Sequence, residues 1–175
     1  MFEDFPQFLP SGICLSCDGC CRFKDRTSPW RPRVTNEERQ EILSITEDRT
    51  EENFTETSIQ GLFYIKAVRG QGQAPCVFLK LDENICRVYA RRPLECRLYP
   101  FLLTKKGDEM VVCVHLSCPF VQEQRTTAGF ERYVQDLERY FQKKRIRDFL
   151  KENPSLAWDY SAYEIEMEEL FVIKL

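Results

Sequence analysis

Residues 14–21 read CLSCDGCC, a stretch that holds four of the chain's nine cysteines at the spacing C-x2-C-x2-C-C. Apolar side chains that pack in a core recur with the period of a helix or a strand, and this cluster has no such period. Gaps of two residues instead allow a loop to turn several thiols toward one centre. Gly19 supplies the permissive backbone that a sharp turn needs. The stretch therefore predicts a site for a metal ion or a metal cluster.

The remaining ligand types indicate which metals suit this site. Bacterial ferredoxin loops hold iron–sulfur clusters with cysteines at these gaps plus a remote cysteine followed by proline, and Cys118-Pro119 offers that remote pair. Tetrahedral zinc takes four cysteine or histidine ligands. The only histidine, His115, has no partner at helical spacing and is expected to be a surface or core residue. Soft thiolates at this density suit either an iron–sulfur cluster, such as 4Fe–4S, or an all-cysteine zinc site.

The adjacent cysteines Cys20 and Cys21 bear on the number of metals. We expect neighbouring side chains to diverge from the backbone, so that the two thiols do not easily bind one small ion. Either they serve different metals, or only one of them is a ligand. The sequence leaves both alternatives open.

A second block, CRVYARRPLECRLYPF at residues 86–101, surrounds two further cysteines with arginines, prolines and tyrosines. The two blocks together resemble a bacterial cysteine-cluster family described as a zinc- or iron-chelating domain, and they are similar to a domain of flagellin lysine N-methylases. The resemblance covers about residues 12–120 and implies a metal bound by cysteines. The matching positions are Cys14, Cys17, Cys20, Cys21, Cys76, Cys86, Cys96 and Cys118. Cys113 lies outside the pattern, between two valines, and is expected to pack in the core.

The arginines of the second block allow two interpretations. In the first, they neutralise the negative charge of the thiolates and lower the pKa values of the thiols. In the second, they line an anion-binding mouth beside the metal. The candidates for contact with a cofactor are Arg87, Arg92 and Arg97, with Arg91 beside them. Aromatic side chains near these arginines are expected to shield the site from water, namely Tyr89, Tyr99 and Phe101.

Length and composition bound the class of protein. The chain has 175 residues, 43% of them hydrophobic, and a formal net charge of −3. These values predict one globular domain, with a metal-binding region at about residues 12–120 and an extension at 121–175. The small net charge does not indicate a nucleic-acid partner. No apolar run is long enough to span a membrane, and the acidic start does not resemble a signal peptide, so we expect a cytoplasmic protein.

Local patterns predict an α+β fold. Thr35 and Glu38 form a capping box before a helix at residues 36–45, and residues 46–58 suggest a surface loop. Residues 1–13 suggest an extended lead-in. The other expected elements are a strand at 61–68, a turn at 70–73, hairpins at 76–89 and 101–116, an amphipathic helix at 127–150 and a strand in the tail.

Three functions follow from these features. The first is an iron–sulfur protein that transfers electrons to a protein partner or acts as an oxidoreductase. The second is a scaffold whose fold depends on zinc. The third is an association with methyl transfer, implied only by the flagellin methylase resemblance. The ferredoxin-like gaps favour the first.

Overall fold

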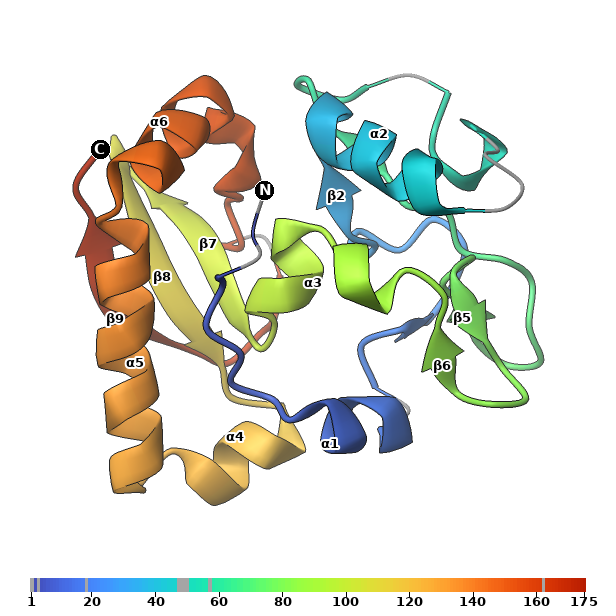
Figure 1. The fold of residues 1–175 in the computed structure, drawn as a ribbon. Helices are drawn as coiled ribbons and strands as arrows, with labels where there is room; N and C mark the ends of the chain where they lie inside the picture. Colours follow the sequence, from blue (N-terminus) through green and yellow to red (C-terminus); the bar gives the residue numbers. More distant parts are fainter. Residues whose placement is uncertain (1, 3, 18, 47–50, 57, 162) are drawn as a thin grey trace. The chain divides into compact units, whose positions relative to one another are not determined.

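The computed structural model describes residues 2, 4–17, 19–46, 51–56, 58–161 and 163–175. The chain forms two compact units, and both are drawn in Figure 1. Unit 1 contains Leu9–Cys96, whereas unit 2 contains Phe2–Phe8 and Arg97–Leu175. The mixture of helices and short antiparallel strands confirms the α+β class. The single domain that we expect from the chain length stays a prediction.

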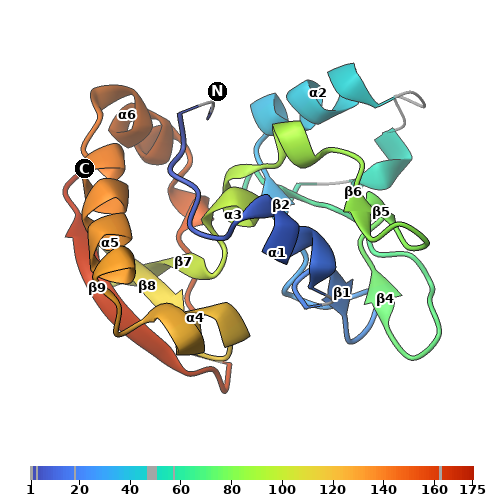
Figure 2. The same cartoon turned by 60° about the horizontal axis from the view of Figure 1, so that its bottom comes forward.

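Unit 1 is built on three antiparallel pairs of two-residue strands. The pairs are β1 (Arg22–Phe23) with β4 (Ala74–Pro75), β2 (Arg33–Val34) with β3 (Phe63–Tyr64), and β5 (Leu79–Lys80) with β6 (Ile85–Cys86). The β1–β4 pair is clearest in the rotated view of Figure 2. The β5–β6 pair is the predicted hairpin, although its strands are shorter than expected. The predicted strand at 61–68 is limited to β3 and isolated bridges at Ile65 and Ala67.

The helices of unit 1 follow the sequence signals in part. Helix α2 (Asn36–Ile45) has the predicted bounds, and its capping box is formed between Thr35 and Glu38. The expectation of an irregular segment up to residue 13 is wrong, because α1 (Ser11–Ser16) begins there. The carbonyl of its N-cap residue, Pro10, accepts the first helical hydrogen bonds, from the NH groups of Ile13 and Cys14. The other helical elements are η1 (Glu51–Asn53), η2 (Tyr89–Arg91) and α3 (Leu94–Leu98), which spans the boundary between the units.

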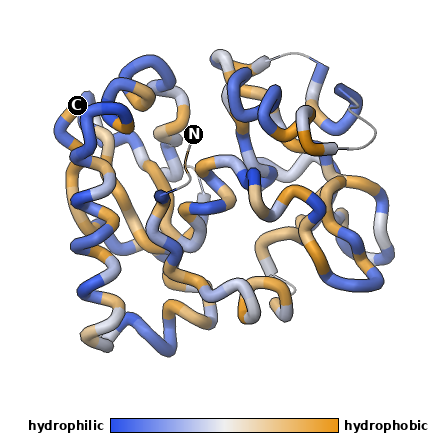
Figure 3. The backbone as a smooth tube through the Cα atoms, in the orientation of Figure 1, coloured by the Kyte–Doolittle hydropathy of each residue, from blue (hydrophilic) through white to orange (hydrophobic). Residues whose placement is uncertain are grey.

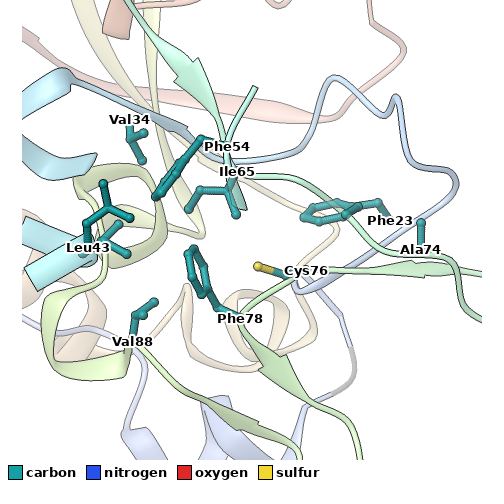
Figure 4. Close-up of a cluster of buried hydrophobic side chains, with 11 residues drawn as sticks. Phe23, Val34, Leu43, Phe54, Ile65, Ala74, Cys76, Phe78 and Val88 are labelled. Carbon is teal, nitrogen blue, oxygen red and sulfur yellow. The ribbon is translucent and has the colours of Figure 1, made fainter. Parts of the chain in front are cut away.

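A small apolar cluster forms the core of unit 1 (Figure 4). Phe54, Ile65 and Phe78 are almost fully buried there, and the sulfur of Cys76 points into the cluster on the side of Phe78. The expectation that residues 46–58 form a surface loop is therefore wrong at Phe54, whose ring packs against that of Phe78 at 5.8 Å. Residues 47–50 and 57 of that segment lie outside the described residues.

Unit 2 is organised around the three-stranded antiparallel sheet β7 (Phe101–Lys106), β8 (Glu109–His115) and β9 (Met167–Ile173). The first two strands are the predicted hairpin, and Gly107 in their turn has the positive φ of 61° that favours glycine. Strand β9 confirms the expected strand in the tail and pairs with β8. Figure 3 shows the apolar character of β8, the central strand, whose interior residues are buried.

The amphipathic helix predicted at 127–150 is two helices, α5 (Ala128–Phe141) and α6 (Lys144–Glu152). A helix continued from Phe141 would turn Lys144, Arg147 and Asp148 toward the core, because these positions continue the buried face of α5. A break at residues 142–143 shifts the phase instead, so that the apolar residues of α6 are buried. The prediction of a single long helix at 127–150 is therefore wrong.

Contacts between aromatic rings hold the remaining parts of unit 2 together. Helix α5 crosses the sheet, with Phe130 and Tyr133 against Phe101 of β7. The ring of Phe8, which lies outside the helices and strands, packs against the same three rings and so belongs to this core. The remaining elements are α4 (Pro119–Gln124) and η3 (Pro154–Leu156). None of the described helices combines the length and the apolar character needed to cross a membrane.

Candidate metal centre

The first cysteine block combines a helix and a tight turn. Cys14 lies on α1, and Cys17 directly follows that helix. The backbone NH of Arg22 donates to the carbonyl of Gly19 at 3.0 Å, which closes a turn with Cys20 and Cys21 at its centre. A Cβ atom at Gly19 would lie 3.3 Å from the sulfur of Cys17. A larger residue at this position would therefore make a tight contact with the sulfur of Cys17.

A backbone hydrogen bond links the first cysteine block to the segment that precedes the second block. Cys86 ends the β5–β6 hairpin, Cys76 precedes it, and Cys96 lies on α3. The backbone NH of Cys76 donates to the carbonyl of Cys21 at 2.9 Å. This hydrogen bond ties the N-terminal turn to the segment that leads into the hairpin.

Seven of the nine thiols belong to unit 1, and charge interactions link them. A thiolate at Cys21 acts electrostatically on four of the others, at positions 14, 76, 86 and 96, and its sulfur hydrogen-bonds to that of Cys20. Cys17 joins the group through its charge interaction with Cys14. The set is Cys14, Cys17, Cys20, Cys21, Cys76, Cys86 and Cys96. All nine cysteines of the chain are free thiols.

The adjacent pair Cys20 and Cys21 departs from expectation. Their side chains do not diverge, because the two sulfurs lie within hydrogen-bonding reach in the turn that follows Gly19. The hydrogen bond from Cys20 lowers the pKa of Cys21 to about 7, with further lowering by Arg22 and Arg92. The same bond, with burial, raises the pKa of Cys20 well above its usual value. The pair therefore presents a thiolate at Cys21 with a thiol beside it.

Three further thiols of the group are disfavoured as thiolates, namely Cys76, Cys86 and Cys96. Burial raises the pKa of Cys76 to about 12 and that of Cys86 to about 11, and it also raises the pKa of Cys96. Neighbouring thiolates add to each of these shifts. A bound cation would reverse both effects, since metal binding and thiol deprotonation are coupled.

Arginines of the second block lie beside these thiols in unit 1. Arg92 donates through Nη1 to the sulfur of Cys14 at 3.8 Å, and its guanidinium lies 3.7 Å from the ring centre of Tyr89. The charge of Arg87 lowers the pKa of Cys76, and its Nη2 donates to the carbonyl of Val77 at 2.9 Å. These contacts support the interpretation that Arg87 and Arg92 balance thiolate charge. Contact with a cofactor stays a prediction.

Several predicted residues belong to unit 2. Arg97 acts there on the pKa of Tyr140, and Phe101 packs in the aromatic core. Tyr99 lies against His115, with its hydroxyl 3.3 Å from Nδ1 of the imidazole. Burial lowers the pKa of His115 and so disfavours the charged imidazolium. That Tyr89, Tyr99 and Phe101 shield a metal from water stays a prediction.

The two remaining cysteines are also part of unit 2. Cys113 is 1% exposed at the centre of β8, in agreement with the core role expected for it. Cys118 is buried at the N-cap of α4, and its NH donates to the carbonyl of His115 at 3.4 Å. Its role as a ligand rests on the sequence pattern alone.

Buried carboxylates, which the sequence did not suggest, fix the α3 segment that carries Cys96. Glu38 accepts hydrogen bonds from the backbone NH of Leu94 at 2.7 Å and of Thr35 at 2.9 Å. Glu95 forms a largely buried ion pair with Arg33 and accepts its backbone NH at 2.7 Å. Burial raises the pKa of Glu38 to about 7. Only the capping-box pattern at Glu38 hinted at this network.

The available ligand atoms are sulfur atoms, which are of a type that binds both zinc and iron. Sulfur is the soft ligand that both metals accept from proteins, and the arginines beside it offset the charge of several thiolates. Throughout the part of the chain that the structure describes, no three cysteine, histidine or acidic side chains form a group that could hold a metal ion as they stand.

Unit 1 carries seven of the nine cysteines on a scaffold of two-residue strands. The sequence model of a family described as "putative zinc- or iron-chelating domain" matches residues 13–119, well over half of the chain. The protein belongs to this family, as the C-x2-C-x2-C-C pattern indicated. No curated protein and no solved structure matches the chain.

Proposed function

We propose that unit 1 binds an iron–sulfur cluster and that the protein transfers electrons, either to a protein partner or within an oxidoreductase reaction. The observation that carries the proposal is that unit 1 holds seven of the nine thiols and that five of them interact with Cys21. This number exceeds the four ligands of a single tetrahedral zinc ion and suits a centre that contains several metal atoms. When bound, the cluster would supply one-electron chemistry.

The proposed ligands are thiols of unit 1. Other groups of the chain would adjust the reduction potential of such a centre. The N–H of Arg92 that points to the sulfur of Cys14 would stabilise the more negative state of the cluster, because hydrogen bonds to sulfur raise a reduction potential. A reducing cytoplasm is the compartment that we propose, since all nine cysteines are free.

A structural zinc site is the second candidate, and the strands of unit 1 favour it. Each of the six strands has two residues, so the backbone ladders contribute little cooperative stability. A metal bound only by the folded chain would add its binding free energy to folding. The protein would then act as a scaffold that presents a surface to a partner. Methyl transfer rests on sequence resemblance alone, and we do not propose it.

Anaerobic purification after growth with both iron and zinc distinguishes the candidates. We expect a brown protein with equal amounts of iron and acid-labile sulfide, whose colour is lost in air. The Cys113→Ala variant, altered in the core of unit 2, serves as the matched control and should retain the colour. A colourless, air-stable protein with stoichiometric zinc would overturn the iron–sulfur assignment and support the scaffold.

A further inference from the structure

Asn84, which closes the β5–β6 turn, contacts the first cysteine block through its side chain. Its backbone has the positive φ of 52°, which asparagine tolerates better than most residues. Its Nδ2 donates to the carbonyl oxygen of Leu15 and, at 3.3 Å, to that of Cys17. One side chain thus joins the hairpin that carries Cys86 to the segment between Cys14 and Cys17.

The same amide also binds the guanidinium group of Arg22. Nη2 of Arg22 donates to Oδ1 of Asn84 at 2.7 Å, so both ends of the amide are used. Arg22 directly follows Cys21, and its charge lowers the pKa of that thiol. The other terminal nitrogen, Nη1, is buried and has no hydrogen-bond partner among the described residues. A buried cationic N–H group without an acceptor is rare in native proteins.

We propose that Asn84 and Arg22 form one positioning unit for the metal centre. Asn84 holds the Cys14–Cys17 segment against the hairpin and orients the guanidinium of Arg22. Nη1 of Arg22 then donates a hydrogen bond to a sulfur of the assembled centre. The acceptor is an anionic sulfur, either a metal-bound thiolate or a cluster sulfide, because such atoms accept charge-assisted hydrogen bonds. This inference rests on the proposed metal-binding function and applies to iron and zinc alike.

Arg22 would act beside Arg92 of the second block, which already donates to the sulfur of Cys14. The guanidinium is planar, so fixing Nη2 on the amide also fixes the direction of Nη1. Lysine would keep the charge but lose this fixed pair of donors. Removal of the Asn84 side chain should therefore weaken the effect of Arg22, and the two residues should act as a unit.

The test compares variants purified anaerobically with their metal. Asn84→Gly keeps the backbone conformation and removes the amide, Asn84→Asp keeps the acceptor for Arg22 and loses the donor, and Arg22→Lys keeps the charge. Lys80→Gln breaks an exposed ion pair with Glu83 in the same turn and is the matched control. The readouts are the rate of metal release to a competing chelator, the absorption spectrum of the centre and the far-ultraviolet circular dichroism.

We expect Asn84→Gly and Arg22→Lys each to release metal at least about tenfold faster, the size of effect typical of residues that support metal ligands. The double variant should be little worse than either single variant, and Lys80→Gln should match the wild type. Metal release from Asn84→Gly at the wild-type rate, or fully additive effects, would overturn the inference. If Asn84→Gly does not fold, metal release from Asn84→Asp is compared instead: faster release supports the inference, and release at the wild-type rate overturns it. A wild-type protein that binds no metal would instead overturn the proposed function.

Discussion

At the scale of single residues, Cys21 is the thiol on which unit 1 converges. Its carbonyl accepts the NH of Cys76, and its sulfur accepts a hydrogen bond from Cys20. The depressed pKa makes it the thiol of this group that ionises most readily near pH 7.

Cys21→Ser should therefore release most of the bound metal and lower the melting temperature, because a hard hydroxyl replaces a soft thiolate poorly. Elemental analysis with thermal unfolding measures both effects. Cys113→Ala is the control: it should keep its metal and cost about 1 kcal/mol of stability through a small cavity. Metal loss from Cys113→Ala would show that Cys113 is a ligand.

The raised pKa of Glu38 predicts a dependence of stability on pH. The carboxyl ionises at about 7 in the folded chain rather than at 4.5, so the folded state holds a proton that the unfolded state has lost between these values. Stability should fall as the pH rises from about 4.5 to 7, by about 3 kcal/mol for this group. Desolvation is the main cause, and the charge of Glu95 adds to it, while Glu95 itself is paired with Arg33.

Urea unfolding at several pH values checks this prediction. Glu38→Gln should lose that part of the pH dependence, although it also weakens the capping box of α2. Glu37→Gln, exposed on the same first turn, should retain the dependence. An unchanged pH profile in Glu38→Gln would contradict the assignment.

At the scale of elements, the connection before β4 depends on a close backbone approach. The segment at 70–73, predicted as a turn, brings Gly70 against the chain that follows it. A Cβ atom at Gly70 would lie 2.5 Å from the carbonyl oxygen of Gln73 and 2.9 Å from Cδ of Pro75. Backbone atoms cannot move aside as the end of a flexible side chain can, so this glycine is required by packing.

Gly70→Ala should therefore destabilise the protein by about 1–3 kcal/mol, the usual cost of forcing extra atoms into a packed site. The matched control is Gly12→Ala on α1, where an added Cβ meets nothing within 4 Å. That change should be neutral or stabilising by up to about 1 kcal/mol, because alanine favours a helix over glycine. Equal unfolding midpoints for the two variants in urea would refute the packing argument.

At the scale of the whole molecule, the two units differ in how they are stabilised. Unit 2 has six- and seven-residue strands in a three-stranded sheet and an aromatic cluster on α5. Unit 1 has two-residue strands, a smaller apolar cluster and a concentration of thiols. Under the proposed function, a metal centre supplies part of the stability that the short strands of unit 1 do not.

Removal of the metal under reducing, anaerobic conditions should therefore affect unit 1 most. Hydrogen exchange measured by mass spectrometry should show lost protection within residues 9–96, while the β7–β9 ladders keep theirs. The chelator should cause no further change in Cys21→Ser, which is the control. Full protection of residues 9–96 after chelation would show that the metal does not support the fold.

The sequence by itself determined the features that depend on local spacing. The C-x2-C-x2-C-C pattern identified the family, the Thr35–Glu38 pair predicted the bounds of α2, and turn residues located both hairpins. Each depends on residues a few positions apart, so short-range geometry was sufficient.

Only the tertiary structure decided what depends on contacts between distant segments. It broke the predicted helix at 127–150, because burial of the α6 residues required a shift of phase. It buried Phe54, and it brought Cys21 to Cys76 and Asn84 to Arg22. No local pattern encodes such pairs, because the chain between the partners sets their distance only when the whole unit packs.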